Sequence, residues 1–133
     1  MPTLVDSNVL LDVLTDDPNW SEWSANALAE QSDREALGIN PIIYAEVSIA
    51  FARIEDLDDA IPASTFHRLS LPWEVAFLAG KCFLAYRRRG GTRSAPLPDF
   101  YIGAHASVSG LTLLTRDAAR YRTYFPKMHL IAP

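Results

Sequence analysis

Two acidic residues directly follow apolar runs that have the length of short buried strands. Asp6 comes after Leu4-Val5, and Asp117 comes after the run 111–116. In an open α/β sheet, the carboxyl ends of parallel strands form the crevice in which ligands bind. The two carboxylates therefore stand where a chemical site is expected.

Two more acidic residues lie on predicted helices, on faces that should be buried. The residues three and four positions either side of Glu46 are apolar: Ile42, Ile43, Ile49 and Ala50. The same positions around Asp99 hold Ala95, Pro96, Ile102 and Gly103. A charge on such a face is costly unless it is paired or binds a metal ion, so both carboxylates need a partner.

Each carboxylate taken alone also has a structural explanation. Asp6 would cap the following helix, Asp99 would place a negative charge at a helix N-terminus, and Asp117 would cap a short helix. Glu46 would form a buried pair with Arg53 or another arginine. Four separate explanations are then needed, whereas convergence at one sheet edge needs a single cause, a shared cation.

The ligand types available restrict which cation that would be. The three histidines show no metal-binding spacing and Cys82 stands alone, so the site would be all oxygen. Such a site suits Mg²⁺ or Mn²⁺, and the chemistry that follows is phosphodiester hydrolysis. Asn8 and Thr115 are short polar residues beside Asp6 and Asp117; they would orient metal-bound waters or cap helices.

Strand and helix patterns alternate along the chain, which predicts an α/β domain with a mostly parallel sheet. The periodicity predicts strands at 4–5, 36–39, 66–71, 111–115 and 130–131. It predicts helices at 7–14, 20–30, 41–53, 55–60, 72–89, 98–110 and 117–121.

The composition is that of an ordinary globular domain. The chain has 133 residues, of which 49% are hydrophobic and 21% are charged, so a single domain over residues 1–133 is expected. The N-terminus lacks the pattern of a secretory signal, and Lys81 interrupts the most apolar segment, 75–85. A soluble, cytoplasmic protein without a membrane segment is expected.

Charge is divided unevenly along the chain. Residues 1–80 hold 14 acidic residues against three Arg, for a net charge of −11, and residues 81–133 hold nine basic residues against two acidic ones, for +7. A basic half indicates either pairing within the fold or a nucleic-acid surface. In the second case, the residues predicted to contact the nucleic acid are Arg87, Arg88, Arg89, Arg93, Arg116 and Arg120. Tyr121 and Tyr124 lie among the last of these, and exposed aromatic rings stack on unpaired bases.

Four segments of the chain resemble the PIN-domain ribonucleases, and specifically the VapC toxins of toxin-antitoxin pairs. The resemblance spans nearly the whole chain and depends on the order and spacing of four motifs. They are Val5-Asp6-Ser7-Asn8-Val9-Leu10-Leu11-Asp12, Tyr44-Ala45-Glu46, Leu97-Pro98-Asp99-Phe100-Tyr101-Ile102-Gly103-Ala104 and Leu113-Leu114-Thr115-Arg116-Asp117.

The resemblance implies a fold, a site and partners. Asp6, Glu46, Asp99 and Asp117 match the acidic quartet of the family, with Asp6 and Asp99 as its surest metal ligands, and Thr115 matches a hydroxyl residue that often precedes the last acid. It further implies a three-layer α/β/α sandwich, homodimerisation, dependence on Mg²⁺ or Mn²⁺, and endonucleolytic cleavage of a structured RNA such as tRNA or rRNA. A VapB-type antitoxin is the implied protein partner.

Two other functions remain open from the sequence. A phosphatase or receiver domain would also place acids at strand ends, but it requires adjacent acids and a positioned lysine, and Asp6 is followed by Ser7-Asn8. A non-catalytic RNA- or protein-binding module would use the acids only structurally. Metal binding distinguishes this module from a nuclease.

Overall fold

The computed structural model describes residues 2–133, which form five strands and seven helices. The strands are β1 (Thr3–Val5), β2 (Leu37–Ile39), β3 (Phe66–Arg68), β4 (Thr112–Leu114) and β5 (Leu130–Ile131). The helices are α1 (Ser7–Leu14), α2 (Ser21–Arg34), α3 (Pro41–Ser48), α4 (Ile54–Ala60), α5 (Trp73–Arg88), α6 (Pro98–Ser109) and α7 (Ala119–Tyr124).

The five strands form one parallel sheet in the order β3-β2-β1-β4-β5. From the central strand β1, the chain first adds β2 and β3 on one side, and then returns to add β4 and β5 on the other. The boundary between β1 and β4 is therefore the topological switch point of the sheet, where ligands bind in open α/β folds. In the pairing of these two strands, Val5 lies opposite Leu114, so both strands end at the same level.

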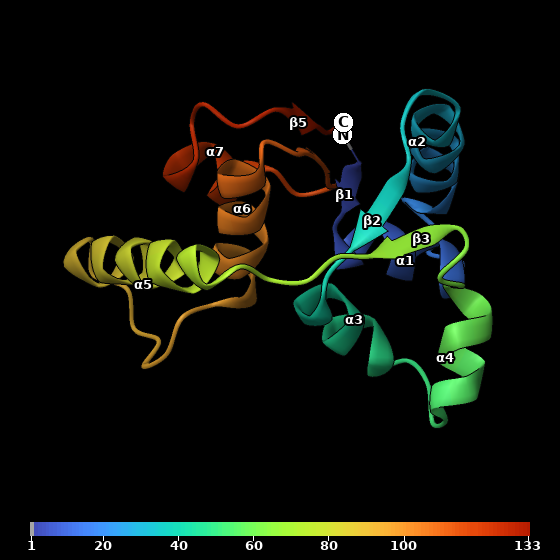
Figure 1. Ribbon diagram of the computed structural model, residues 1–133, viewed down its shortest axis with the longest axis horizontal. Helices are drawn as coiled ribbons and strands as arrows, with labels where there is room; N and C mark the ends of the chain where they lie inside the picture. Colours follow the sequence, from blue (N-terminus) through green and yellow to red (C-terminus); the bar gives the residue numbers. More distant parts are fainter. Residues whose placement is uncertain (1) are drawn as a thin grey trace.

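The helices cover both faces of the sheet. Because crossover connections between parallel strands are right-handed, the reversal of direction after β3 places α5, α6 and α7 on the face opposite α1 and α2. Figure 1 shows this separation, with α6 and α7 on one side of β1 and α2 on the other. The expected α/β class, parallel sheet and three-layer arrangement are confirmed.

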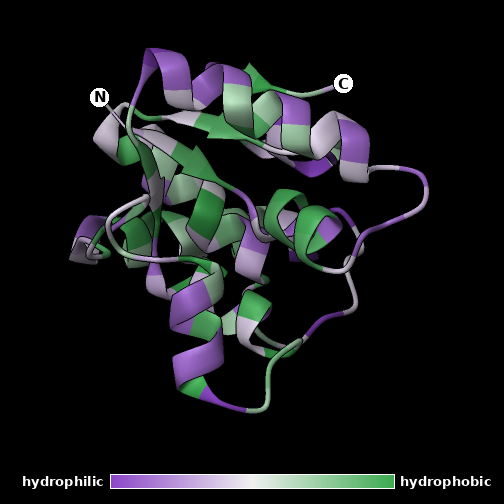
Figure 2. Cartoon of the chain, turned by 90° about the vertical axis from the view of Figure 1, so that its right-hand side faces the viewer, coloured by the Kyte–Doolittle hydropathy of each residue, from purple (hydrophilic) through white to green (hydrophobic). Residues whose placement is uncertain are grey.

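The hydrophobic core lies between the sheet and these helices. All residues of β1 and β2 are buried, and the strands are predominantly hydrophobic whereas the helices mix both kinds of residue (Figure 2). On α6, Gly103 leaves the space that the ring of Phe125 fills, since a Cβ there would lie 2.3 Å from that ring. This close approach holds the C-terminal end of α7 against α6.

The predicted helix 41–53 is too long. α3 ends at Ser48, and tight turns follow in which the amides of Ala50 and Phe51 donate to the carbonyls of Val47 and Ser48. The apolar pattern continues past the helix through residues 49–52, although the first of them, Ile49, is 86% exposed. The periodicity depends on residue type and not on burial, so it predicted a helix that extends beyond the observed end.

The last predicted helix is displaced by a few residues. α7 spans Ala119–Tyr124 instead of 117–121, because the backbone N–H of Asp117 donates to the hydroxyl of Thr115 and holds the chain in a turn. By contrast, α6 ends as expected at Gly110, which adopts a left-handed conformation with φ +66°.

No helix within residues 2–133 is both long and apolar enough to cross a lipid bilayer.

Candidate active site

Asp6 is the most deeply buried of the four carboxylates. It leaves β1 in an extended conformation and is the N-cap of α1, and Oδ1 accepts a 2.8 Å hydrogen bond from the amide of Ser7. Oδ2 accepts hydrogen bonds from the hydroxyls of Tyr121 at 2.8 Å and Thr115 at 2.9 Å. Burial raises the pKa of Asp6, and these hydrogen bonds oppose the rise. The capping role and a place in the site are therefore compatible.

Glu46 approaches Asp6 from α3. That helix starts at Asn40, whose side chain accepts a hydrogen bond from the amide of Ile43, and Pro41 occupies the first turn. The hydroxyl of Ser7 donates to Glu46 Oε1 at 2.8 Å, which ties α3 to the start of α1. Burial raises the pKa of Glu46, and the negative charges of Asp6 and Asp99 raise it further. The alternative pairing of Glu46 with Arg53 is absent: the ion pair of Arg53 is with Glu55.

Asp99 lies in the first turn of α6, directly after Pro98. Its Oδ1 is 3.4 Å from the hydroxyl of Tyr121, and its Oδ2 is 3.4 Å from Nη1 of Arg120. Burial raises the pKa of Asp99, while Arg120 and Tyr121 oppose the rise and the charge of Asp117 adds to it. Asp99 therefore lies between Asp6 and Asp117.

Asp117 is exposed and does not cap α7, whose N-cap is Ala118. It lines an open hollow of about 420 Å³ together with Asp99, Arg120 and the rings of Tyr86 and Tyr124. The structure thus brings the four acids, which come from four separate segments, to the edge of the sheet where β1 and β4 end.

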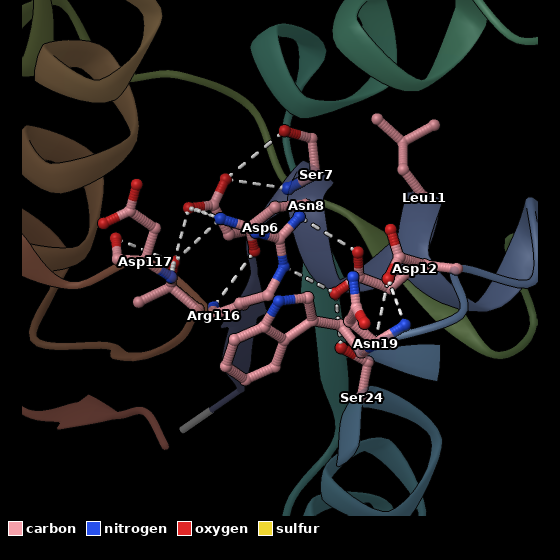
Figure 3. A network of polar contacts seen from close by, with 12 residues as sticks. Asp6, Ser7, Asn8, Leu11, Asp12, Asn19, Ser24, Arg116 and Asp117 are labelled. Atoms are coloured by element: carbon pink, nitrogen blue, oxygen red, sulfur yellow. Dashed lines mark hydrogen bonds and ion pairs between the residues drawn. The ribbon is translucent and has the colours of Figure 1, made fainter. Parts of the chain in front are cut away.

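The supporting residues form a bridge between β1 and β4. Asn8 donates to the hydroxyl of Thr115 at 3.2 Å and accepts from the amide of Arg116 at 3.1 Å. Thr115 in turn holds Asp6 and the amide of Asp117. Asn8 is not a helix cap. It holds the loop after β4 against α1, next to Asp6 (Figure 3).

The donor set suits a hard divalent cation. All four side chains offer carboxylate oxygens, and buried carboxylates with raised pKa values gain when a cation offsets their charge. Within residues 2–133, no group of three or more acidic, His or Cys side chains is arranged as it stands to hold a metal ion. Mg²⁺ does not require three protein ligands, because it retains several waters and is bound by one or two carboxylates together with substrate phosphates.

Tyr121 is the site residue that the sequence pattern misassigned. Its side chain is only 1% exposed, so it is not available to stack on a base, and its hydroxyl points at Asp6 and Asp99. No local pattern signals this role, because Tyr121 and Asp6 lie 115 positions apart in the chain. Tyr124 is half-buried, and its ring lies under the guanidinium of Arg89 at 5.2 Å.

The six arginines predicted to contact RNA differ in how they are held. Arg116 forms a two-point ion pair with buried Asp12, and its guanidinium carbon lies 5.5 Å from the centre of the Trp20 ring. Figure 3 shows this side chain directed to Asp12, away from Asp117. Arg120 faces Asp99. The other four are exposed around the end of α5, where Arg87 donates to the carbonyl of Arg93.

Comparison with known proteins agrees with this geometry. A family model of the PIN domain matches residues 3–126. The chain belongs to the PIN-domain family. A sequence comparison of this PIN domain with curated proteins finds no match.

Several solved structures share the fold of this PIN domain. A chain in the structure of VapBC2 from Rickettsia felis bound to a DNA fragment from its promoter has a TM-score of 0.75 at 17% identity, with 100% of this chain and 99% of that one covered. For a chain of VapBC-1 from nontypeable Haemophilus influenzae, the TM-score is 0.74 at 16% identity, with 99% of this chain and 98% of that one covered. For a chain of FitAcB from Neisseria gonorrhoeae, the TM-score is 0.69 at 19% identity, with 97% of this chain and 96% of that one covered.

Proposed function

We propose that this PIN domain is a metal-dependent endoribonuclease and the toxin of a VapBC-type pair. The observation that carries the proposal is the convergence of Asp6, Glu46, Asp99 and Asp117 at the switch point of the sheet. Burial raises the pKa values of three of these carboxyls, those of Asp6, Glu46 and Asp99, and groups perturbed in this way concentrate at functional sites.

Asp6 and Asp99 are the proposed principal ligands of Mg²⁺ or Mn²⁺, with Glu46 and Asp117 completing the set. When bound, the ion would polarise the scissile phosphate and lower the pKa of an attacking water. Ser7 and Thr115 orient the carboxylates by donating to Glu46 and Asp6. Asp117 is exposed in the hollow, where it would accept a proton from the attacking water.

The RNA would approach from the basic end of the molecule. The exposed guanidiniums of Arg87, Arg88 and Arg89 lie at the C-terminal end of α5, and that of Arg93 lies in the loop that leads to Asp99. Contacts of this kind with phosphates supply affinity without reading sequence. Arg120 would add a contact beside the acids, whereas the pairing of Arg116 with Asp12 favours a structural role for that residue.

A protein partner is also proposed. Solved relatives with this fold include VapBC complexes and a toxin-antitoxin complex from Klebsiella pneumoniae. On α5, Trp73 is 90% exposed and Phe77 is 69% exposed, which is unusual for such large apolar side chains and supports a protein interface. Both a VapB-type antitoxin and a homodimer are part of the proposal, in the cytoplasm where RNA substrates reside.

Cleavage of total cellular RNA by the purified protein tests the function. We expect discrete fragments with Mg²⁺ or Mn²⁺ and none with EDTA. Asp6→Asn and Asp99→Asn should each lower the cleavage rate by about 100-fold or more, because each removes a charged ligand while keeping the side-chain shape. Circular dichroism should show that both variants remain folded.

Other outcomes would favour a different function. RNA binding without cleavage by the antitoxin-free protein, unchanged by Mn²⁺, would favour the non-catalytic module. Hydrolysis of a phosphate monoester in place of RNA would favour the phosphatase. The phosphatase is disfavoured because Lys81 is exposed on α5, over the ring of Phe77, and does not lie among the carboxylates.

A further inference from the structure

A single buried hydroxyl lies between two carboxylates of the site, those of Asp6 and Asp99. The Tyr121 oxygen lies 2.8 Å from Asp6 Oδ2 and 3.4 Å from Asp99 Oδ1. The phenol carries one proton, and the shorter distance assigns it to Asp6. No other tyrosine within residues 2–133 touches a carboxylate of this site.

The position of this hydroxyl is fixed by packing. Tyr121 is 1% exposed, and its backbone carbonyl accepts a hydrogen bond from the amide of Phe125. The ring of Phe125 fills the space beside Gly103 on α6, the helix that carries Asp99. The tyrosine and Asp99 are therefore mounted on two helices that are locked together.

The hydroxyl of Tyr121 is an uncharged hydrogen-bond donor, and its partner Asp6 lies 2.8 Å away. A neutral donor orients a carboxylate without placing a positive charge beside it. In this respect it differs from Arg120, whose charge repels any cation that approaches Asp99.

The donors to Asp6 are divided between its two oxygens. Oδ2 receives the hydroxyls of Tyr121 and Thr115, which fill its two lone-pair positions, and the side-chain amide of Asn8 lies 3.5 Å from the same oxygen. Oδ1 has one firm donor, the amide of Ser7; the Ser7 hydroxyl is 3.4 Å away and only 2.8 Å from Glu46. Oδ1 is thus the oxygen that keeps a lone pair for a further partner.

We propose that Tyr121 is a positioning residue of the cation site, holding Asp6 so that one carboxylate oxygen is saturated by hydroxyls and the other stays open to a divalent ion. This inference rests on the proposed metal site and adds to it a residue outside the acidic quartet. Outer hydrogen bonds of this type orient metal ligands, and their loss lowers metal affinity about 10- to 100-fold.

Isothermal titration of the wild type and of two variants with Mn²⁺, in the absence of RNA, tests the inference. Tyr121→Phe keeps the ring and its packing and removes only the hydroxyl; we expect the Kd for Mn²⁺ to rise about tenfold. The matched control is Tyr44→Phe, which removes a hydroxyl that donates at 2.7 Å to Asp58, a carboxylate outside the site. The Kd of Tyr44→Phe for Mn²⁺ should equal that of the wild type.

A second readout guards against a general loss of stability. The Tm of both variants is measured in EDTA and again with saturating Mn²⁺. We expect the Mn²⁺-induced rise in Tm to shrink in Tyr121→Phe at a given Mn²⁺ concentration and to remain unchanged in Tyr44→Phe, whatever the Tm in EDTA.

The outcomes separate this inference from the proposed function. If the wild type binds Mn²⁺ and Tyr121→Phe binds it equally well, the positioning role is wrong and the metal site stands. Tighter binding by Tyr121→Phe also overturns it, since the hydroxyl would then compete with the ion. If the wild type binds no Mn²⁺, both the metal site and the role of Tyr121 are wrong.

Discussion

Arg116 and Arg120 lie four residues apart, and each forms an ion pair with an aspartate, but the two pairs differ in geometry and burial. Arg116 contacts both oxygens of Asp12, at 2.8 and 3.0 Å, and the Asp12 side chain is 3% exposed. Arg120 makes a single 3.4 Å contact with Asp99, and both side chains are more than one third exposed. The first pair fixes the loop after β4 to α1, whereas the second can open when a ligand arrives.

The comparison shows that sequence position alone does not determine the role of a basic residue beside an acidic site. Both arginines belong to the basic half of the chain, and both were predicted to contact RNA. Burial of the partner decides between them: a two-point pair with a buried carboxylate is strong and directional, and a single exposed contact is weak.

Removing the buried partner should have the largest effect on stability. Asp12→Ala leaves Arg116 and the hydroxyl of Ser24 without their acceptor, so we expect a loss of about 3 kcal/mol in the free energy of unfolding. Arg120→Ala should cost less than about 1 kcal/mol. Urea unfolding in EDTA measures both, and equal losses would contradict the distinction between the two pairs.

The two arginines should also differ in RNA binding, with an effect of intermediate size. Measured in an Asp6→Asn background that prevents cleavage, Arg120→Ala should lower the slope of log affinity against log salt concentration by about 0.7, as expected for one lost phosphate contact. Arg116→Ala should leave the slope unchanged when assayed below its Tm. A lowered slope in Arg116→Ala would restore its predicted role as an RNA contact.

The smallest expected effect concerns the charge of Asp99 in the metal-free protein. Because its pKa is raised in the fold, ionised Asp99 costs stability at neutral pH, and this cost disappears as the pH falls through its folded-state pKa. Asp99→Asn should therefore raise the Tm slightly at pH 7.5 in EDTA, with a difference that narrows toward pH 4. At neutral pH, removing the charge of Asp12 should have the opposite effect and lower the Tm. A lower Tm for Asp99→Asn at pH 7.5 would instead indicate a stabilising role for this acid.

Much of the fold and the placement of the acids followed from the sequence. Leu4-Val5 and 111–115 predicted the two central strands, and Asn40-Pro41 and Gly110 marked helix ends through well-defined capping chemistry. The apolar neighbours of Glu46 predicted a buried position; its side chain is half-buried, but two of those neighbours, Ile49 and Ala50, are exposed. These signals are local, and so one sequence contains them.

The side-chain partners were not predictable in the same way. The pair of Asp12 with Arg116 joins residues 104 positions apart, and the hydrogen bond of Tyr121 to Asp6 joins residues 115 apart. No periodicity relates such positions, because the contacts arise only when α1, α7 and the end of β4 meet. The exposed Ile49 shows the converse error, in which a local apolar pattern extended a helix beyond its end.

The distance along the chain between Asp6 and its two hydroxyl donors has a consequence for the synthesis of the protein. Thr115 and Tyr121 follow Asp6 by 109 and 115 positions along the chain, and β4 has to insert beside β1 before they meet. Because nascent chains fold from the N-terminus as they emerge, a partly translated chain holds Asp6 without the residues that orient it. The cation site that we propose is therefore incomplete until β4 and α7 have been made.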